Sequence, residues 1–154
     1  MYTQSLCLII NLTIRSGLFK AMVDKNEDIS DLITLVPDTK GIHSSYILGE
    51  TESPYGFYIY IPGGYEDHMD NYPLLIFLHG DGERGNSAEQ AEKLEYVTYY
   101  GPPRLIQEGK WNPSHPMIVA TPQSSDERWD LNKVGTFIKY IQDTKEYSQD
   151  FLKM

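Results

Sequence analysis

A continuous apolar run at residues 74–78 (LLIFL) ends abruptly in the loop 79–85 (HGDGERG), which contains three glycines. An apolar run of this length, without alternating polar residues, is typical of a strand that is buried on both faces, as in a parallel sheet. The functional loops of such sheets follow the carboxyl ends of the strands. We therefore expect the chemistry of this chain to lie in residues 79–85.

The chain has 154 residues, which suits one domain with a hydrophobic core and is short for two. Its 40% of hydrophobic residues and 23% of charged residues are typical of a globular protein and argue against disorder. A formal net charge of -9 makes nucleic acid or an anionic membrane an unfavourable partner.

The amino-terminal segment Leu6–Ile14 is apolar but too short to cross a bilayer as a helix. No Lys or Arg precedes it and no clean small-residue cleavage site follows, so a strand or a leader is favoured over a signal peptide. Cytoplasmic and exported locations both stay open. The single cysteine, Cys7, excludes an intrachain disulfide framework and a cysteine-based zinc site.

The chain divides into a weakly patterned amino-terminal part and a strongly patterned remainder. We interpret residues 1–50 as a leader or extra strands, with short strands expected at 32–36 and around 46–48. Residues 51–154 contain the regular pattern of the domain.

A strand is predicted at residues 56–62 (GFYIYIP), where Tyr58 and Tyr60 share one face and aliphatic and phenyl side chains share the other. The two tyrosines suit a platform for stacking on a sugar. Packing within the sheet is the favoured interpretation, because aromatic residues are enriched in strands.

Strand, helix and strand then follow one another. Ser87 and Gln90 match a capping box, which predicts a helix that runs to the Gly-Pro-Pro sequence at 101–103. An apolar strand is expected at 116–122, parallel to its partner at 74–78, since the connection is a βαβ crossover. An amphipathic helix at 131–141 should cover one face. The pattern indicates an α/β fold with a mainly parallel sheet and flanking helices.

The HGDG sequence at 79–82 directly after a buried strand matches half of an oxyanion hole. The tetrahedral intermediate of ester cleavage carries negative charge on oxygen and is stabilised by preorganised N–H donors. Glycines let the backbone turn these donors inward without obstruction by side chains. The plainer interpretation of the same pattern is a tight strand-to-helix turn.

Residues 73–85 (PLLIFLHGDGERG) resemble the strand and oxyanion loop of the phospholipase/carboxylesterase-like α/β-hydrolases, whose members are often labelled predicted peptidases or polyhydroxybutyrate depolymerase-like esterases. The resemblance continues through 100–106 (YGPPRLI), 118–123 (IVATPQ) and Trp129 with the helix after it. It covers roughly residues 55–143 and implies an incomplete α/β-hydrolase fold.

By this resemblance, the backbone N–H of Asp81 points at the oxyanion, with Gly82 beside it. Family members commonly have a small residue where this chain has Asp81. A carboxylate that faced the pocket would repel an oxyanion, whereas one that faced away would leave only the N–H to matter.

Other residues of the loop are expected to support it. Glu83 and Arg84 resemble structural positions that form an ion pair or hydrogen bonds within the loop. His79 and Gly80 also resemble supporting positions, and His79 does not correspond to the catalytic histidine of the family. Gln123, at the end of the strand 116–122, is expected to line the pocket.

The family's nucleophile lies in a Gly-x-Ser-x-Gly turn after the next strand and is followed by an acid and a histidine. This sequence contains no Gly-x-Ser-x-Gly. Ser124 and Ser125 follow a strand, but they lack flanking glycines, and the last histidine is His115. The chain therefore resembles the amino-terminal half of a hydrolase and ends before the nucleophile.

The expected function is that of a truncated serine esterase, which retains the oxyanion loop but is inactive alone. The complete enzyme would hydrolyse a small-molecule or polysaccharide-linked ester without a metal or an organic cofactor. The alternative is a non-catalytic ligand-binding or interaction protein derived from the same fold. A metal site built from His79, Asp81, Glu83 and His115 is disfavoured, because their spacing matches no ligand pattern.

The strand 74–78 should be central and should pair on one side with the strand that carries the nucleophile. Without that neighbour its edge would be bare, which favours self-association. The other expectation is that the amino-terminal segment of the chain fills the gap.

Overall fold

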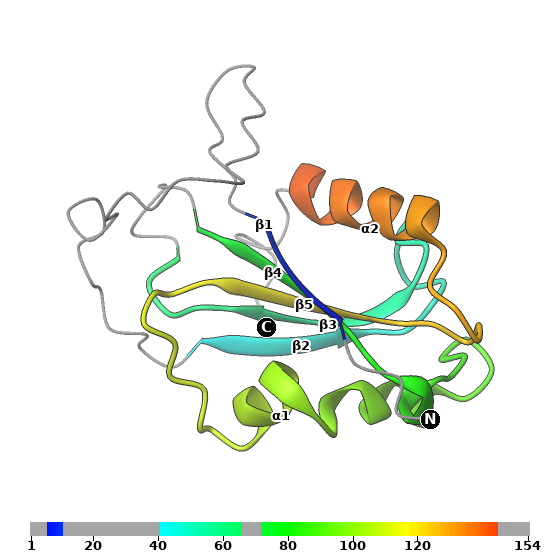
Figure 1. Cartoon of the computed structure of the whole chain (residues 1–154), viewed down its shortest axis with the longest axis horizontal. Coiled ribbons are helices and arrows are strands. Elements are labelled where there is room, and N and C mark those ends of the chain that lie inside the picture. The colour runs from blue at the N-terminus through cyan, green and yellow to red at the C-terminus, as the bar shows by residue number, and fades with distance from the viewer. Residues whose placement is uncertain (1–5, 11–40, 66–71, 145–154) are drawn as a thin grey trace.

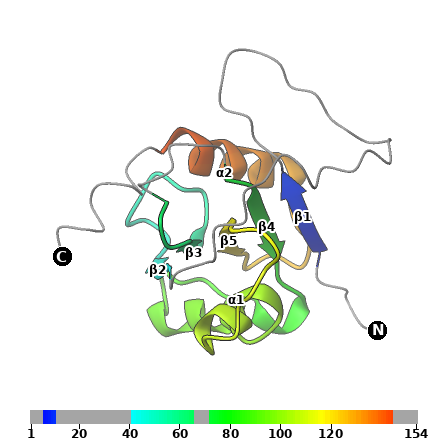
Figure 2. The same cartoon turned by 90° about the vertical axis from the view of Figure 1, so that its left-hand side faces the viewer.

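The structure, a computed structural model, describes residues 6–10, 41–65 and 72–144, with the side chains of the last two ranges. Five strands form one sheet in the order β1-β4-β5-β3-β2. Figures 1 and 2 show α2 over one face of this sheet and α1 with the 3₁₀ helix η3 over the other. The strands are β1 (Leu6–Ile10), β2 (Ile42–Tyr46), β3 (Gly56–Ile61), β4 (Leu74–Leu78) and β5 (Ile118–Gln123).

The sheet is mixed, which corrects the expectation of a mainly parallel sheet. Only β4 and β5 are parallel, as their βαβ connection predicted, while β1–β4, β2–β3 and β3–β5 are antiparallel. Apolar runs indicate that a strand is buried, but they do not indicate its direction. The α/β class with helices on both faces is confirmed.

β4 lies inside the sheet, and all five of its residues are buried. It pairs with β5 on one edge and with β1 on the other, where Leu6 lies opposite Leu78 and Ile10 opposite Leu74. β4 therefore has no bare edge. The expectation that the amino-terminal segment pairs with this edge of β4 is confirmed. Both β1 and β2 come from the first fifty residues and belong to this same sheet.

The hydrophobic core lies on both faces of the sheet, as the alternation in β3 predicted. Phe57 and Ile59 face α2 (Leu131–Asp143) and pack with Phe137, whereas Tyr60 faces the α1 side with Leu75 and Val119. Tyr60 is buried, so packing within the sheet is confirmed as the role of this ring.

The predicted helix at 131–141 is confirmed as α2. Asp130 caps its first turn, because Oδ1 accepts from the N–H groups of Asn132 at 2.8 Å and Lys133 at 3.3 Å. The apolar side chains Val134, Phe137 and Ile141 are buried against the sheet.

The prediction that Ser87 begins a helix as part of a capping box is wrong. The Ser87 hydroxyl accepts from the N–H of Leu48 at 3.0 Å and so joins two distant loops. In place of one helix, the segment forms η3 (Ala91–Thr98) and α1 (Gly101–Gln107), and a further short 3₁₀ helix, η2 (Asp81–Glu83), precedes Ser87.

The Gly-Pro-Pro sequence begins α1 instead of ending a helix, because proline is tolerated in the first turn. The strand expected around 46–48 lies slightly earlier, as β2. The strand expected at 32–36 lies outside the described residues.

Candidate functional site

The residues that follow β4 and β5 lie together, because parallel neighbours end at the same edge of a sheet. We call residues 79–85 and 123–130 the loop site. The N–H of Ser124 donates to Nε2 of His79 at 2.9 Å, and the N–H of Gly85 donates to the carbonyl of Ser124 at 3.1 Å. The sequence pointed to the first of these two segments, and the parallel pairing brings the second against it.

His79 is the buried centre of the loop site, with 4% of its surface exposed. Nε2 accepts the Ser124 N–H, so the ring is neutral and its proton is on Nδ1, which donates to the carbonyl of Gly80 at 2.6 Å. Burial lowers the pKa of His79, against the opposing effect of the bond to Gly80. Both ring nitrogens are occupied, so His79 does not present a free general base.

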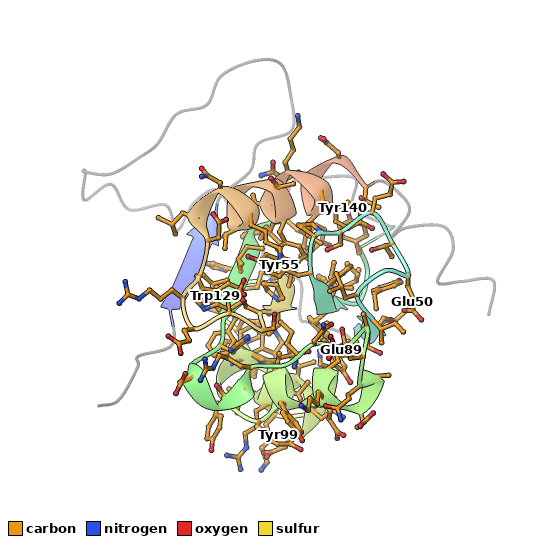
Figure 3. All side chains as sticks on the ribbon, turned by 90° about the vertical axis from the view of Figure 1, so that its right-hand side faces the viewer. Glu50, Tyr55, Glu89, Tyr99, Trp129 and Tyr140 are labelled. Carbon is orange, nitrogen blue, oxygen red and sulfur yellow. The ribbon has the colours of Figure 1, made fainter. Side chains whose placement is uncertain are left out.

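Trp129 joins the loop site to α2. Its Nε1 donates to the carbonyl of His79 at 3.2 Å, and the two rings meet edge to face with centroids 4.8 Å apart. Tyr55 packs in the same cluster, and the centroid of its ring lies 5.6 Å from that of Trp129 and 5.9 Å from that of Phe137. Figure 3 shows Tyr55 and Trp129 on the α2 side of the sheet and Tyr99 on the opposite side.

The Tyr55 phenol is buried in this aromatic cluster. Burial, with nearby carboxylates, raises the pKa of Tyr55 to about 12, so the phenol stays neutral. The ammonium of Lys133 lies 4.4 Å from the centre of its ring, within the range of a cation–π contact. This aromatic cluster therefore packs against the loop site through the contact between Trp129 and His79.

Asp81 turns its carboxylate toward Arg84 at the surface of the loop. Oδ1 of Asp81 lies 2.8 Å from Nη2 of Arg84, and Nε of Arg84 donates to the backbone carbonyl of Asp81 at 3.1 Å. The ion pair expected from the sequence therefore joins Arg84 to Asp81, and Glu83 is not its partner. Two contacts between the same residues fix the turn and the direction of the carboxylate.

The backbone at residues 80–82 presents N–H groups at the start of η2. Gly80 precedes η2 with extended backbone, and no side chain caps the first turn. The first N–H groups of a helix have no partner within the helix, so those of Asp81 and Gly82 are candidate donors to a ligand. A methyl group at Gly82 would meet no atom within 4 Å, so this side of the turn is open.

Gln123 is buried against the loop 79–85 and holds it through a hydrogen bond to the backbone. It is 4% exposed, and its Nε2 donates to the carbonyl of Glu83 at 3.2 Å and to that of Lys93 at 2.5 Å. A side chain at Gly85 would approach the Gln123 amide to 2.7 Å, so the glycine allows this close packing. The buried Oε1 of Gln123 has no hydrogen-bond partner among the described residues. The expected pocket-lining residue therefore lies beneath the loop.

The serines after β5 do not form a nucleophile–base pair with His79. The hydroxyl of Ser124 accepts from the N–H of Asp126 at 3.2 Å, while Ser125 is exposed. Neither hydroxyl has a hydrogen bond to a histidine ring within the described part of the chain. The loop site thus contains hydrogen-bond donors without an activated nucleophile.

Residues 41–65 and 72–144 contain no group of three His, Cys, Asp or Glu side chains placed to hold a metal ion, and the disfavoured set His79, Asp81, Glu83 and His115 does not come together there. No helix among them has the length and apolarity to cross a bilayer. A shallow depression of about 310 Å³ lies away from the loop site and is lined by Glu95, Thr98, Tyr99, Arg104, Gln107 and Glu108.

Neither a model of a protein family nor a curated protein sequence matches this chain.

Proposed function

We propose that the chain is the oxyanion-loop half of a carboxylesterase-type α/β-hydrolase. The N–H groups of Asp81 and Gly82 would stabilise the negative oxygen that forms when an ester carbonyl is attacked. The nucleophile, acid and histidine would come from sequence outside these 154 residues. The chain alone would then bind an ester weakly and would not cleave it.

The observation that carries this proposal is the rigid support beneath an open turn. Below the turn, His79 and Gln123 hold the backbone through buried hydrogen bonds. At its surface, the Asp81 carboxylate is paired with Arg84, so this partner balances part of the negative charge that would repel an oxyanion. Preorganised donors of this kind typically contribute about 10²–10³ in kcat for each donor.

The second candidate is a non-catalytic interaction protein on the same fold. One observation favours it: β1 pairs with the outer edge of β4, so β4 has no free edge among the described strands. A strand carrying the nucleophile would need that edge. The two candidates therefore differ in whether another strand ever replaces β1.

Ester hydrolysis by two proteins separates these candidates. One is the 154-residue chain, and the other is the protein translated from a reading frame that continues past the Met154 codon. The first candidate requires a Gly-x-Ser-x-Gly sequence in the continued frame, with turnover of 4-nitrophenyl acetate by the longer protein alone. Unrelated sequence in that frame, or equal turnover by both proteins, contradicts it.

A further inference from the structure

Trp129 belongs to the segment between β5 and α2, but its indole reaches the loop after β4. Its Nε1 donates to the backbone carbonyl of His79 at 3.2 Å. Its ring also meets the imidazole of His79 edge to face, with centroids 4.8 Å apart. One side chain therefore contacts both the backbone and the ring of His79.

The residue after His79 is a glycine whose conformation decides how the loop continues. Gly80 has extended backbone, with a φ of -84° and a ψ of -164°, directly before η2 begins. Glycine adopts more backbone conformations than any other residue, so its own preference does not select this one. Because peptide groups are planar, φ and ψ of Gly80 set the angle between the peptide plane before it and the plane after it. The direction in which η2 starts therefore depends on what holds these two planes.

Both planes are held through their carbonyl oxygens. The carbonyl of His79 lies in the plane before Gly80 and accepts from Nε1 of Trp129. The carbonyl of Gly80 lies in the plane after it and accepts from Nδ1 of His79 at 2.6 Å. In a trans peptide the C=O and N–H bonds point in opposite directions, so the second hydrogen bond turns the N–H of Asp81 away from the imidazole.

Trp129 is anchored outside the loop 79–85. The residue after it, Asp130, caps the first turn of α2 through two backbone N–H groups. The ring of Tyr55 packs against the indole, with centroids 5.6 Å apart. Figure 3 shows Tyr55 and Trp129 on the α2 side of the sheet. The donor to the His79 carbonyl is thus fixed by α2 and by the aromatic cluster.

We propose that Trp129 is a positioning residue, which acts with His79 to fix the two peptide planes around Gly80 and so the direction of the Asp81 N–H. The use of that N–H as a donor to an oxyanion rests on the function proposed above. Its direction does not rest on that function and can be measured in the 154-residue chain. Without the indole N–H, the plane before Gly80 loses its donor and is free to turn.

The two tryptophans of the chain provide a matched pair of variants. Trp129→Phe keeps an aromatic ring beside His79 and removes the indole N–H. Trp111→Phe makes the same change at a buried indole N–H that has no hydrogen-bond partner among the described residues. Residual dipolar couplings in isotope-labelled, weakly aligned chains report the direction of each backbone N–H bond.

Trp129→Phe should change the couplings of Gly80 and Asp81, whereas Trp111→Phe should leave them as they are in the unmodified chain. A tryptophan with a merely structural role would lower the free energy of unfolding when replaced, without turning these two N–H bonds. Unchanged couplings in Trp129→Phe, or equal changes in the two variants, overturn the proposal.

A second substitution covers loss of folding from the smaller phenyl ring. Benzothienylalanine at position 129, in a chain that also carries Trp111→Phe, keeps the shape of the indole and replaces its N–H by sulfur. In a chain folded by circular dichroism, it should change the same two couplings. Couplings equal to those of the Trp111→Phe chain overturn the proposal, even where Trp129→Phe does not fold. The reading frame past the Met154 codon tests the proposed function separately, so either idea can fail alone.

Discussion

His79 connects the loop after β4 to the residue after β5, and this role depends on a neutral ring. Nε2 must lack a proton to accept the N–H of Ser124. Protonation would replace this acceptor with a donor that faces another donor. The buried position of the ring, which lowers its pKa, is consistent with that requirement.

The stability of the chain should therefore fall on acidification. The pKa of His79 in the folded chain lies below its ordinary value of 6.5, so the unfolded chain binds more protons between the two values. The contribution of neutral His79 to the free energy of unfolding is complete above pH 6.5 and decreases as the pH falls through 6.5 toward the folded pKa. Urea unfolding at several pH values measures this slope, and His79→Gln should reduce it while costing about 1–3 kcal/mol.

His43 provides the comparison for that experiment. Its pKa is also lowered by burial, so His43→Gln should remove a separate part of the same slope. An unchanged slope in His79→Gln would show that the ring is not held neutral.

Gly101 allows α1 to begin against Phe77. It has a φ of +64°, and a Cβ atom there would lie 2.5 Å from the Phe77 ring. Gly109 has a similar φ of +66° but open space around it. We expect Gly109→Ala to cost about 1–2 kcal/mol from backbone strain. Gly101→Ala should cost about 1–3 kcal/mol more from the contact, and equal losses in urea unfolding would contradict this packing.

Among the elements, α2 is the one whose start is most clearly defined by a side chain. Asp130→Ala removes the acceptor for two N–H groups and should cost about 1 kcal/mol in the free energy of unfolding. Asp130→Asn keeps an oxygen acceptor and should lose only a fraction of that. Equal losses for the two variants in thermal unfolding would assign the effect to charge instead of to the cap.

The sequence predicts elements well where the hydrophobic pattern is regular. Residues 56–62 and 131–141 carry a clear strand or helix period, residues 74–78 form a continuous apolar run, and the structure agrees with each. The prediction for residues 87–107 fails because Ser87 and Gln90 resemble a helix cap by residue type alone. Ser87 bonds to Leu48, thirty-nine positions away in the sequence, and no local pattern reports that contact.

In the candidate site, too, the sequence predicts the element but not its tertiary contacts. The HGDG motif points to the loop, and the parallel pairing of β4 and β5 indicates which segment should meet it. The partners of the side chains are tertiary contacts. Neither the bond from Ser124 to His79 nor the position of Gln123 beneath the loop follows from local sequence, because each joins residues far apart in the chain.

In the whole molecule, β1 determines whether β4 has a free edge. With β1 paired, we expect a monomer in light scattering, because the apolar central strand is covered. Replacing both Leu8 and Ile9 by proline should disrupt β1 and increase self-association, since the N–H groups of neighbouring strand residues point to opposite edges and one of the two therefore faces β4. Ile9→Val should leave the monomer unchanged. A monomeric double-proline variant of unaltered stability would show that β1 does not protect this edge.

Under the proposed function, the N–H of Asp81 stabilises an oxyanion once a nucleophile is present. The kcat for 4-nitrophenyl acetate of the protein extended past the Met154 codon tests this role. Asp81→Pro removes the N–H at a helix position that tolerates proline, whereas Asp81→Ala removes the carboxylate and keeps the N–H. We predict that Asp81→Ala keeps kcat within a few-fold and that Asp81→Pro lowers it by about 10²–10³. Equal kcat values for the two folded variants would contradict the claim.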